Sequence, residues 1–224
     1  MTTSGDLDRL KEYVLGLGPA DPFESVYRAS HRHRLEHGES CMLHPSDPLT
    51  MRLVSVLAGS CHARLLLDIG GGIGYSALHL ALAAGADAVV DTIEGEPSHV
   101  ALAKENVAAA GYDRRIVVHL GRSEQTLLEL TGPYDFVYDD GWFMREPAHR
   151  EPLLERMSIG GLLVNTNWFP LEDAVAGRES PWAAPGNTAW ADSVQAYADK
   201  LSNHPRLRMA FTLRPFLGMA VKVA

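Results

Sequence analysis

The chain has 224 residues, which is enough to bury a sizeable core within a single domain. Hydrophobic residues make up 46% and charged residues 21% of the composition, and this excludes an intrinsically disordered chain. The formal net charge of -8 at pH 7 argues against a protein that grips nucleic acid, because such binding depends on clustered Lys and Arg.

No part of the chain approaches the run of about 18 apolar residues that a membrane span needs. Residues 1–9 are polar and lack the apolar core of a signal peptide. Cys41 and Cys61 are too few for a disulfide framework and lack the spacing of a CxxC site. We therefore expect a cytoplasmic protein with reduced thiols and no membrane partner.

Residues 6–59 are predicted to form helices that precede the main sheet, with breaks at Gly18-Pro19 and near His44-Pro45. This pattern divides the chain into a helical cap over residues 1–60, for substrate and dimer contacts, and a main domain over residues 61–224.

Several potential zinc or copper ligands gather in the cap: His31, His33, His37, Cys41 and His44. Their spacing is irregular, and Arg32 and Arg34 between them would repel a cation. An amphipathic, partly charged helix is therefore the favoured interpretation.

From residue 64 onward, short Val/Ile/Leu-rich runs alternate with amphipathic segments, which is typical of an α/β fold. The expected strands are residues 64–69, 88–93, 115–119, 134–139, 161–165, 207–213 and 217–223. The expected helices are residues 74–84, 97–110, 124–130, 149–157 and 188–203. We predict a Rossmann-like, doubly wound, seven-stranded and mostly parallel sheet with helices on both faces.

The last two strands leave no room for a helix between them, because Arg214-Pro215 marks a tight turn. They are expected to form an antiparallel hairpin at the sheet edge. Residues 169–187 are rich in Pro, Gly and Ala and long for a connection, which predicts a lid or binding loop.

A buried strand runs into the turn Gly70-Gly71-Gly72-Ile73-Gly74 and then into a helix. Ligands of open parallel sheets bind in the crevice at this edge, and glycines let the backbone approach them closely. Glu94 ends the next strand, at the interval where an acid meets the hydroxyls of a ribose. The pattern predicts a ligand that contains ribose.

Two ligands remain, because Gly72-x-Gly74-x-x-Ala77 can also be taken for a degenerate dinucleotide fingerprint. Asp68 helps to decide between them. A carboxylate two residues before the first glycine would crowd a pyrophosphate, whereas it suits a ligand with an ammonium group and a sulfonium centre.

From Leu65 to the C-terminus the chain resembles the catechol and caffeoyl-CoA O-methyltransferases, a class I methyltransferase group (O-methyltransferase family 3). The matching segments are Asp68-Ile69-Gly70, Gly74-Tyr75-Ser76-Ala77, Thr92-Ile93-Glu94, Gly121-Arg122-Ser123, Tyr134-Asp135-Phe136-Val137, Asp140-Gly141-Trp142, Gly160-Gly161-Leu162, Asn167, His204-Pro205-Arg206-Leu207 and the stretch 215–218.

The resemblance implies S-adenosylmethionine as cofactor and places residues around it. Asp68, Gly70 and Ser76 would hold the methionine end, Glu94 the ribose, and Ser123 would border the adenine. The stretch around Met42 and Leu43 would close over the methionine moiety. Gly72 and Asp140 are expected at the same cofactor site.

The resemblance also implies a divalent ion, usually Mg²⁺, held by an Asp after the fourth strand and an Asp-Asn pair after the fifth. Such a cation lowers the pKa of a bound hydroxyl and orients the resulting oxyanion. Asp140 and Asn167 match two of these ligands and are expected at the reaction centre, but Thr166 stands where the second carboxylate is expected. Whether a metal binds therefore stays open.

Phe143 stands where the family supplies a general-base Lys. The alternatives are His149, which we take as the candidate catalytic residue, His44, Asp139, or a substrate that is already ionised. Trp142 and Trp168 are expected to form an aromatic wall around a planar acceptor.

The leading hypothesis is methyl transfer from S-adenosylmethionine to an oxygen of a small aromatic or hydroxylated acceptor, by a homodimer. Thr166 and Phe143 keep two alternatives open. One is a metal-independent methyltransferase acting on a nitrogen, a carboxylate or a modified tRNA base. The other is a non-catalytic cofactor-binding protein. A nicotinamide-dependent dehydrogenase is less favoured than any of these.

Overall fold

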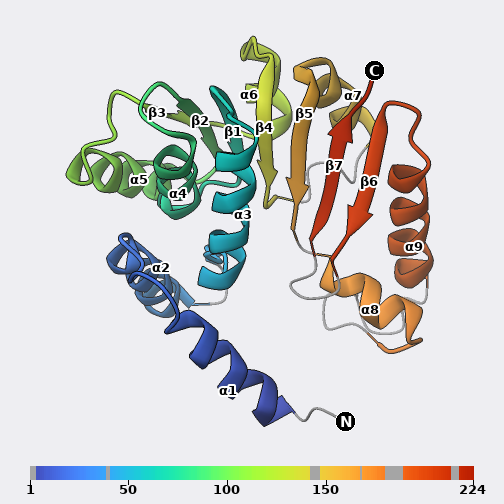
Figure 1. Ribbon diagram of the computed structural model, residues 1–224, viewed down its shortest axis with the longest axis horizontal. Coiled ribbons are helices and arrows are strands. Elements are labelled where there is room, and N and C mark those ends of the chain that lie inside the picture. The colour runs from blue at the N-terminus through green and yellow to red at the C-terminus, as the bar shows by residue number, and fades with distance from the viewer. Residues whose placement is uncertain (1–3, 39–40, 142–146, 167, 180–188, 213–216) are drawn as a thin grey trace.

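The computed structural model describes residues 4–38, 41–141, 147–166, 168–179, 189–212 and 217–224. Its centre is a seven-stranded sheet with the strand order β3-β2-β1-β4-β5-β7-β6 (Figure 1). The strands are β1 (Leu65–Ile69), β2 (Val89–Glu94), β3 (Ile116–Leu120), β4 (Tyr134–Asp139), β5 (Met157–Asn165), β6 (Leu207–Phe211) and β7 (Gly218–Lys222).

The neighbouring pairs from β3 to β5 are all parallel, whereas β7 pairs antiparallel with both β5 and β6. The mostly parallel sheet and its antiparallel C-terminal pair are therefore confirmed. Because parallel strands end at one edge, the carboxyl ends of β1, β2 and β4 lie side by side.

Nine helices occur in the described residues: α1 (Ser4–Leu15), α2 (Glu24–His37), α3 (Pro48–Ser60), α4 (Tyr75–Ala84), α5 (Pro97–Ala109), α6 (Ser123–Glu129), α7 (Pro147–Glu155), α8 (Phe169–Val175) and α9 (Ala189–Ser202). None of the described helices is both long enough and apolar enough to cross a membrane.

Alternating side chains of each strand enter two separate hydrophobic clusters, as the two-residue period of a strand requires. Leu66 and Phe136 belong to a cluster that also contains Met51 of α3 and Leu78 of α4. The opposite face presents its own strand residues to α6, α7 and α9: Leu67, Ile69, Val137 and Leu163. Helices therefore cover both faces of the sheet.

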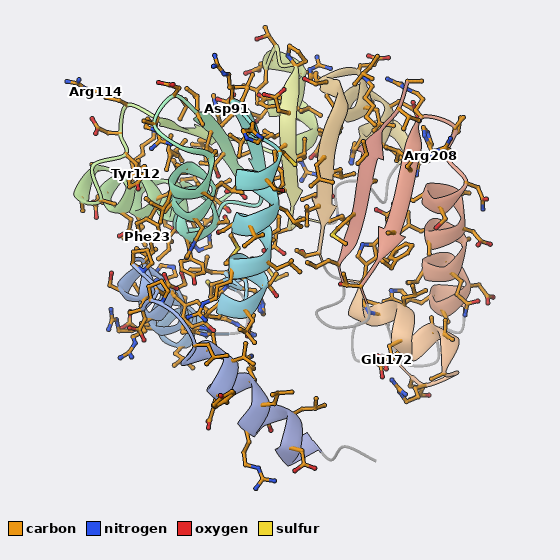
Figure 2. All side chains as sticks on the ribbon, viewed as in Figure 1. Phe23, Asp91, Tyr112, Arg114, Glu172 and Arg208 are labelled. Carbon is orange, nitrogen blue, oxygen red and sulfur yellow. The ribbon has the colours of Figure 1, made fainter. Side chains whose placement is uncertain are left out.

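The segment before the sheet is packed onto it rather than separate from it. Phe23 contacts Tyr112 edge to face, with ring centroids 5.9 Å apart (Figure 2). The guanidinium of Arg52 donates hydrogen bonds of 2.8–3.1 Å to the carbonyl oxygens of Val14, Leu15 and Leu17 at the end of α1. The last carbonyls of a helix lack partners in a following turn. The Val14 carbonyl also accepts a hydrogen bond from the Leu17 N–H, and Arg52 adds further donors that hold α1 against α3.

Two expectations differ from the structure. Residues 169–175 form the helix α8 rather than a loop, and Pro170 lies in its first turn, where its missing N–H costs nothing. Of the predicted lid, residues 180–187 lie outside the described residues. The second difference is the start of strand β5, which is Met157 rather than residue 161. Met157 pairs with Tyr134, and the register shifts before the next pair, Phe136 with Leu162. The helical pattern of residues 149–157 hides this start in the sequence.

Candidate cofactor and acceptor site

A cavity of about 820 Å³ lies at the carboxyl ends of the parallel strands. Its wall combines the glycine turn after β1, the end of β2, the residues after β4, and the cap segment between α2 and α3. This is the expected crevice of a doubly wound sheet, and its size suits a small organic ligand.

The glycine turn is shaped by backbone conformations that favour glycine. Gly70, Gly72 and Gly74 have φ angles of +89°, +53° and +96°. A Cβ on Gly72 would lie 2.7 Å from the Leu43 side chain, and one on Gly71 would lie 1.9 Å from the Thr92 hydroxyl. The turn therefore brings bare backbone to the cavity wall.

The Glu94 carboxylate is fixed at this wall. One oxygen accepts a hydrogen bond of 2.8 Å from the Gly72 N–H, and the other accepts one of 2.8 Å from the Glu96 N–H. The Nδ1 atom of His99 lies 3.5 Å from the second oxygen. Glu94 lines the cavity, where a carboxylate with further lone pairs accepts hydrogen bonds from a diol.

Asp68 is fully buried beneath the cavity. Its Oδ2 accepts hydrogen bonds from Ser76 at 2.9 Å and Thr92 at 2.8 Å, and its Oδ1 has no hydrogen-bond partner among the described residues. Burial, with a smaller contribution from the carboxylates of Asp140 and Glu94, raises the pKa of Asp68 to about 7, although the hydrogen bonds from Thr92 and Ser76 oppose the rise. Ser76 lines the cavity, whereas Asp68 lies behind it.

The cavity is electrostatically negative, since the carboxylates of Glu94, Glu96 and Asp140 line it. Such a surface attracts a cationic ligand and disfavours the two negative charges of a pyrophosphate.

Asp140 is held by hydroxyl groups from two other elements. Its Oδ2 accepts a hydrogen bond of 2.9 Å from Ser46, and its Oδ1 accepts one from the Thr166 hydroxyl. The Tyr138 hydroxyl lies 2.8 Å from the Ser46 oxygen, and burial raises the pKa of Tyr138 well above its usual range. Asp140 is therefore the carboxylate of a hydroxyl network that joins the cap to β4 and β5.

Asp139 points into the protein and is fully buried. One of its carboxylate oxygens accepts a hydrogen bond of 3.0 Å from the Gly141 N–H, and the other accepts one of 2.7 Å from the Asn165 amide. Its role is to hold the chain after β4, and it does not line the cavity.

The described residues around Asp140 do not fit a hard divalent cation. Thr166 brings a neutral hydroxyl where a second carboxylate is expected, and it binds Asp140 directly. No group of three potential ligands among His, Cys, Asp and Glu forms there within the described part of the chain. Asn167, the other expected ligand, lies outside the described residues.

Other expected site residues fall in different places. Met42 lines the cavity with 76% of its surface exposed, and His44 lines it as well. Ser123 begins α6, just beyond Gly121, whose N–H donates a hydrogen bond to the Glu94 carbonyl oxygen. His149 lies on α7, and it is not among the described residues that line the cavity.

The two tryptophans expected at the acceptor differ in what the structure describes. Trp142 lies outside the described residues. Trp168 is only 3% exposed and stacks on Tyr197 of α9 at a centroid distance of 4.8 Å. This places Trp168 in the core between the sheet and α9, and not among the described residues that line the cavity.

Ser46 and His99 are site residues that sequence reasoning missed. Ser46 lies in the irregular segment before α3, and His99 lies five residues after Glu94 on α5. Ser46 and His99 reach the cavity only because separate elements pack together there. Their positions in the sequence therefore give no indication that they lie at the site.

The raised pKa of Asp68 predicts a stability change with pH. Its folded value of about 7 lies above the value of about 3.9 in an unfolded chain. The stability that the neutral carboxyl contributes is complete below the unfolded pKa and is lost as the pH rises through the folded pKa. We therefore expect Asp68→Asn to gain about 2 kcal/mol in unfolding free energy relative to the wild type between about pH 5 and pH 8.

Denaturant unfolding of the cofactor-free protein at the two pH values measures this gain, and Asp135→Asn is the control. Burial alone would raise the pKa of Asp135, but the N–H groups of Arg64 and Leu65 bind its carboxylate and lower that pKa. The stability that Asp135 contributes is thus already complete at pH 5 and unchanged at pH 8. An equal difference between Asp68→Asn and the wild type at both pH values would contradict the raised pKa.

Comparisons with known proteins agree on one family. The model of the O-methyltransferase family matches residues 36–215. A catechol O-methyltransferase of Mycobacterium tuberculosis is 38% identical over 117 residues, which cover 52% of this chain and 53% of that protein, so the match spans only about half of its length. An O-methyltransferase of Aspergillus thermomutatus is 34% identical over 174 residues, which cover 71% of each.

The fold likeness extends over the whole chain. The O-methyltransferase TomG of Streptomyces achromogenes, solved in complex with SAM, superposes with a TM-score of 0.79 over 100% of both chains at 21% identity. At that identity the likeness supports the fold alone, but the family model covers most of the chain. On its sequence and its seven-stranded architecture, this chain belongs to the O-methyltransferase family.

Proposed function

We propose that the protein transfers a methyl group from S-adenosylmethionine to an oxygen of a small aromatic or hydroxylated acceptor. The observation that carries the proposal is the Glu94 carboxylate, which the Gly72 N–H and the Glu96 N–H fix at the cavity wall. The family supports the same activity, since the relatives found are named O-methyltransferases.

The residues around the cavity fit this cofactor. Glu94 would accept the ribose hydroxyls, and the bare backbone of Gly70 and Gly72 would allow close contact. Ser76, backed by the unpartnered Oδ1 of Asp68, would hold the methionine ammonium group, because a buried anion is best satisfied by a cation. When bound, the cofactor supplies a methyl group on a sulfonium that an oxygen nucleophile displaces.

Of the remaining cofactor contacts in this proposal, Met42 and Asp140 line the same cavity and Ser123 begins α6. Met42 would cover the methionine moiety, Asp140 would lie near its charge, and Ser123 would border the adenine.

His44 is the proton acceptor in this proposal. Desolvation, helped by Arg34 and His31, lowers its pKa below the usual range, so the imidazole is neutral near pH 7 and able to take a hydroxyl proton. Of the expected bases, His44 lines the cavity, whereas Asp139 and His149 are not among its described lining residues.

Two substitutions separate binding from chemistry. Glu94→Gln removes a charged acceptor and is expected to weaken binding of S-adenosylhomocysteine roughly 10- to 100-fold in calorimetry. His44→Gln is expected to keep that affinity and to lower kcat about 10²- to 10⁴-fold with a phenolic or catecholic acceptor.

Glu96→Gln is the matched control, because Glu96 also lines the cavity but its carboxylate caps α5. It is expected to leave the affinity within about threefold of the wild type. Unchanged binding in Glu94→Gln would contradict the cofactor site. Binding without turnover of any acceptor in the wild type would favour a non-catalytic cofactor-binding protein.

The hydroxyl network around Asp140 favours a metal-independent version of this reaction. Ser46 and Thr166 occupy one oxygen each of the Asp140 carboxylate, so the interactions that a cation would provide come from hydroxyl groups. In this proposal Asp140 orients the acceptor, and alignment supplies much of the acceleration.

Restoring the missing carboxylate tests that version. Wild-type turnover is expected to be independent of added Mg²⁺, whereas Thr166→Asp is expected to gain a dependence on Mg²⁺, because two adjacent carboxylates bind a hard cation. Thr166→Asn, which has no added charge, is the control. Metal independence would be contradicted if Mg²⁺ stimulated the turnover of the wild type at least as strongly as it stimulates that of Thr166→Asp.

We also propose that the protein is a homodimer that assembles through α1. Leu10, Tyr13 and Leu17 are 54%, 67% and 51% exposed, and their spacing of three and four residues places Leu10 and Tyr13 on one side of the helix and Leu17 just past its end. Helix α1 projects from the body of the molecule (Figure 1).

Light scattering is expected to give twice the chain mass for the wild type and a single chain mass for Leu10→Lys/Tyr13→Lys. Leu35→Lys, at an exposed residue of α2, is the control and is expected to stay dimeric. A wild-type monomer at high concentration would contradict the assembly.

A cytoplasmic location is also proposed, and it is supported by two free cysteines.

A further inference from the structure

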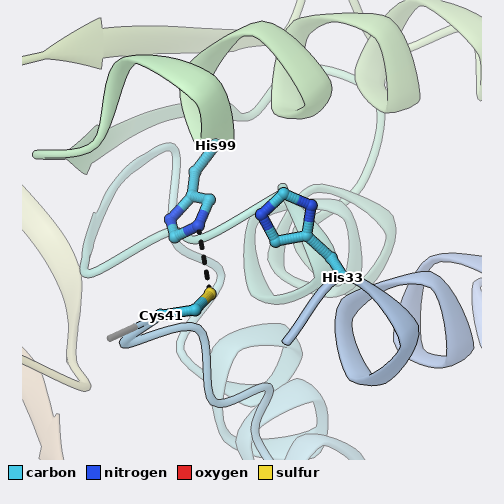
Figure 3. A group of neighbouring side chains, drawn as sticks. All are labelled: His33, Cys41 and His99. Atoms are coloured by element: carbon cyan, nitrogen blue, oxygen red, sulfur yellow. Dashed lines mark hydrogen bonds between the residues drawn. The ribbon is translucent and has the colours of Figure 1, made fainter. Parts of the chain in front are cut away.

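Three potential metal ligands from three separate elements meet at the edge of the cavity. His33 comes from α2, Cys41 from the segment after it, and His99 from α5 (Figure 3). One ligand atom of each residue lies within 4.8 Å of the other two. The Sγ of Cys41 lies 3.7 Å from Nε2 of His99.

These distances suit a tetrahedral zinc site. Bond lengths of about 2.3 Å to sulfur and 2.0 Å to nitrogen place neighbouring ligand atoms about 3.5 Å apart. The Cys41–His99 pair already has nearly that separation, and His33 needs only a small side-chain adjustment. One thiolate and two imidazoles form a ligand set that Zn²⁺ prefers over Mg²⁺ or Ca²⁺.

The surroundings of His99 orient it as a ligand. Its Nδ1 faces the Glu94 carboxylate at 3.5 Å, and its Nε2 points toward Cys41. In the proposed site Nε2 would bind the metal and Nδ1 would donate toward Glu94. A carboxylate behind a histidine in this way fixes the ring and increases its basicity toward a metal. His99 is only 6% exposed, so the packing around it limits the motion of its ring.

The ring of His33 is packed against two other imidazoles. It meets the ring of His99 edge to face, with centroids 5.1 Å apart. His37 stacks on His33 with centroids 4.0 Å apart and so limits the ring's rotation. Arg32 and Arg34, whose charges opposed a metal at the sequence level, are exposed and do not line the cavity.

We propose that His33, Cys41 and His99 bind one Zn²⁺, with the fourth position open to the cavity. The site would bridge α2 and the segment after it to α5, and so would hold the helical cap against the sheet domain beside Glu94. This proposal is independent of methyl transfer, because the three ligands and the bridge require neither cofactor nor acceptor.

Tag-free protein, stripped of metal and titrated without cofactor, tests the site. Calorimetry is expected to show one Zn²⁺ per chain with a Kd below about 1 µM. Zn²⁺ is also expected to raise Tm, because it binds only the folded arrangement of the three elements. Absence of stoichiometric binding in folded wild-type protein would overturn the proposal.

Co²⁺ identifies the ligands, because a cobalt-bound thiolate gives a charge-transfer absorption in the near ultraviolet. Cys41→Ser is expected to lose this band, and His99→Gln and His33→Ala to weaken Co²⁺ binding at least tenfold. Cys61→Ser and His31→Ala are the matched controls, since Cys61 is the other free cysteine and His31 lies on α2 beside Tyr27.

Both controls are expected to keep the wild-type spectrum. Circular dichroism establishes that each variant is folded before titration. A band that survives Cys41→Ser, or one that disappears in Cys61→Ser, would overturn the assignment of Cys41 as the ligand.

Discussion

The hydrogen bonds of the Glu94 carboxylate hold the site together, and much of the cavity depends on them. This side chain binds the Gly72 N–H of the turn after β1 and the Glu96 N–H before α5. Backbone N–H groups at a crevice need acceptors, and a carboxylate provides strong ones. One acid at the end of β2 thus ties the glycine turn to the start of the next helix and leaves its remaining lone pairs facing the cavity.

The topology of the sheet concentrates negative charge at one edge. Asp68, Glu94 and Asp140 lie near the carboxyl ends of β1, β2 and β4, which are neighbours in the sheet. Burying carboxylates costs free energy unless hydrogen bonds or a cation compensate. Hydroxyl groups provide part of that compensation: Ser46 and Thr166 for Asp140, and Ser76 and Thr92 for Asp68. A positively charged ligand would supply the rest of the compensation that these carboxylates need.

The helical cap contributes directly to this edge. Met42, His44 and Ser46 enter the cavity wall from the segment between α2 and α3, and His33 and Cys41 reach α5 beside it. Contacts such as Phe23–Tyr112 and the hydrogen bonds of Arg52 hold the cap in place. The cap and the sheet therefore share one cavity, and the chemistry of the site depends on groups from both.

Features that depend on neighbouring residues were determined by the sequence alone. The alternation of apolar runs and amphipathic helices predicted the seven-stranded sheet, and the glycine turn with Glu94 indicated the edge at which the cavity lies, because strand period, helix period and turn chemistry are local. Side-chain contacts between distant elements were decided only by the tertiary structure. The approach of Thr166 to Asp140, the burial of Trp168 against Tyr197, and the meeting of His33, Cys41 and His99 all depend on packing, for which chain spacing carries no signal.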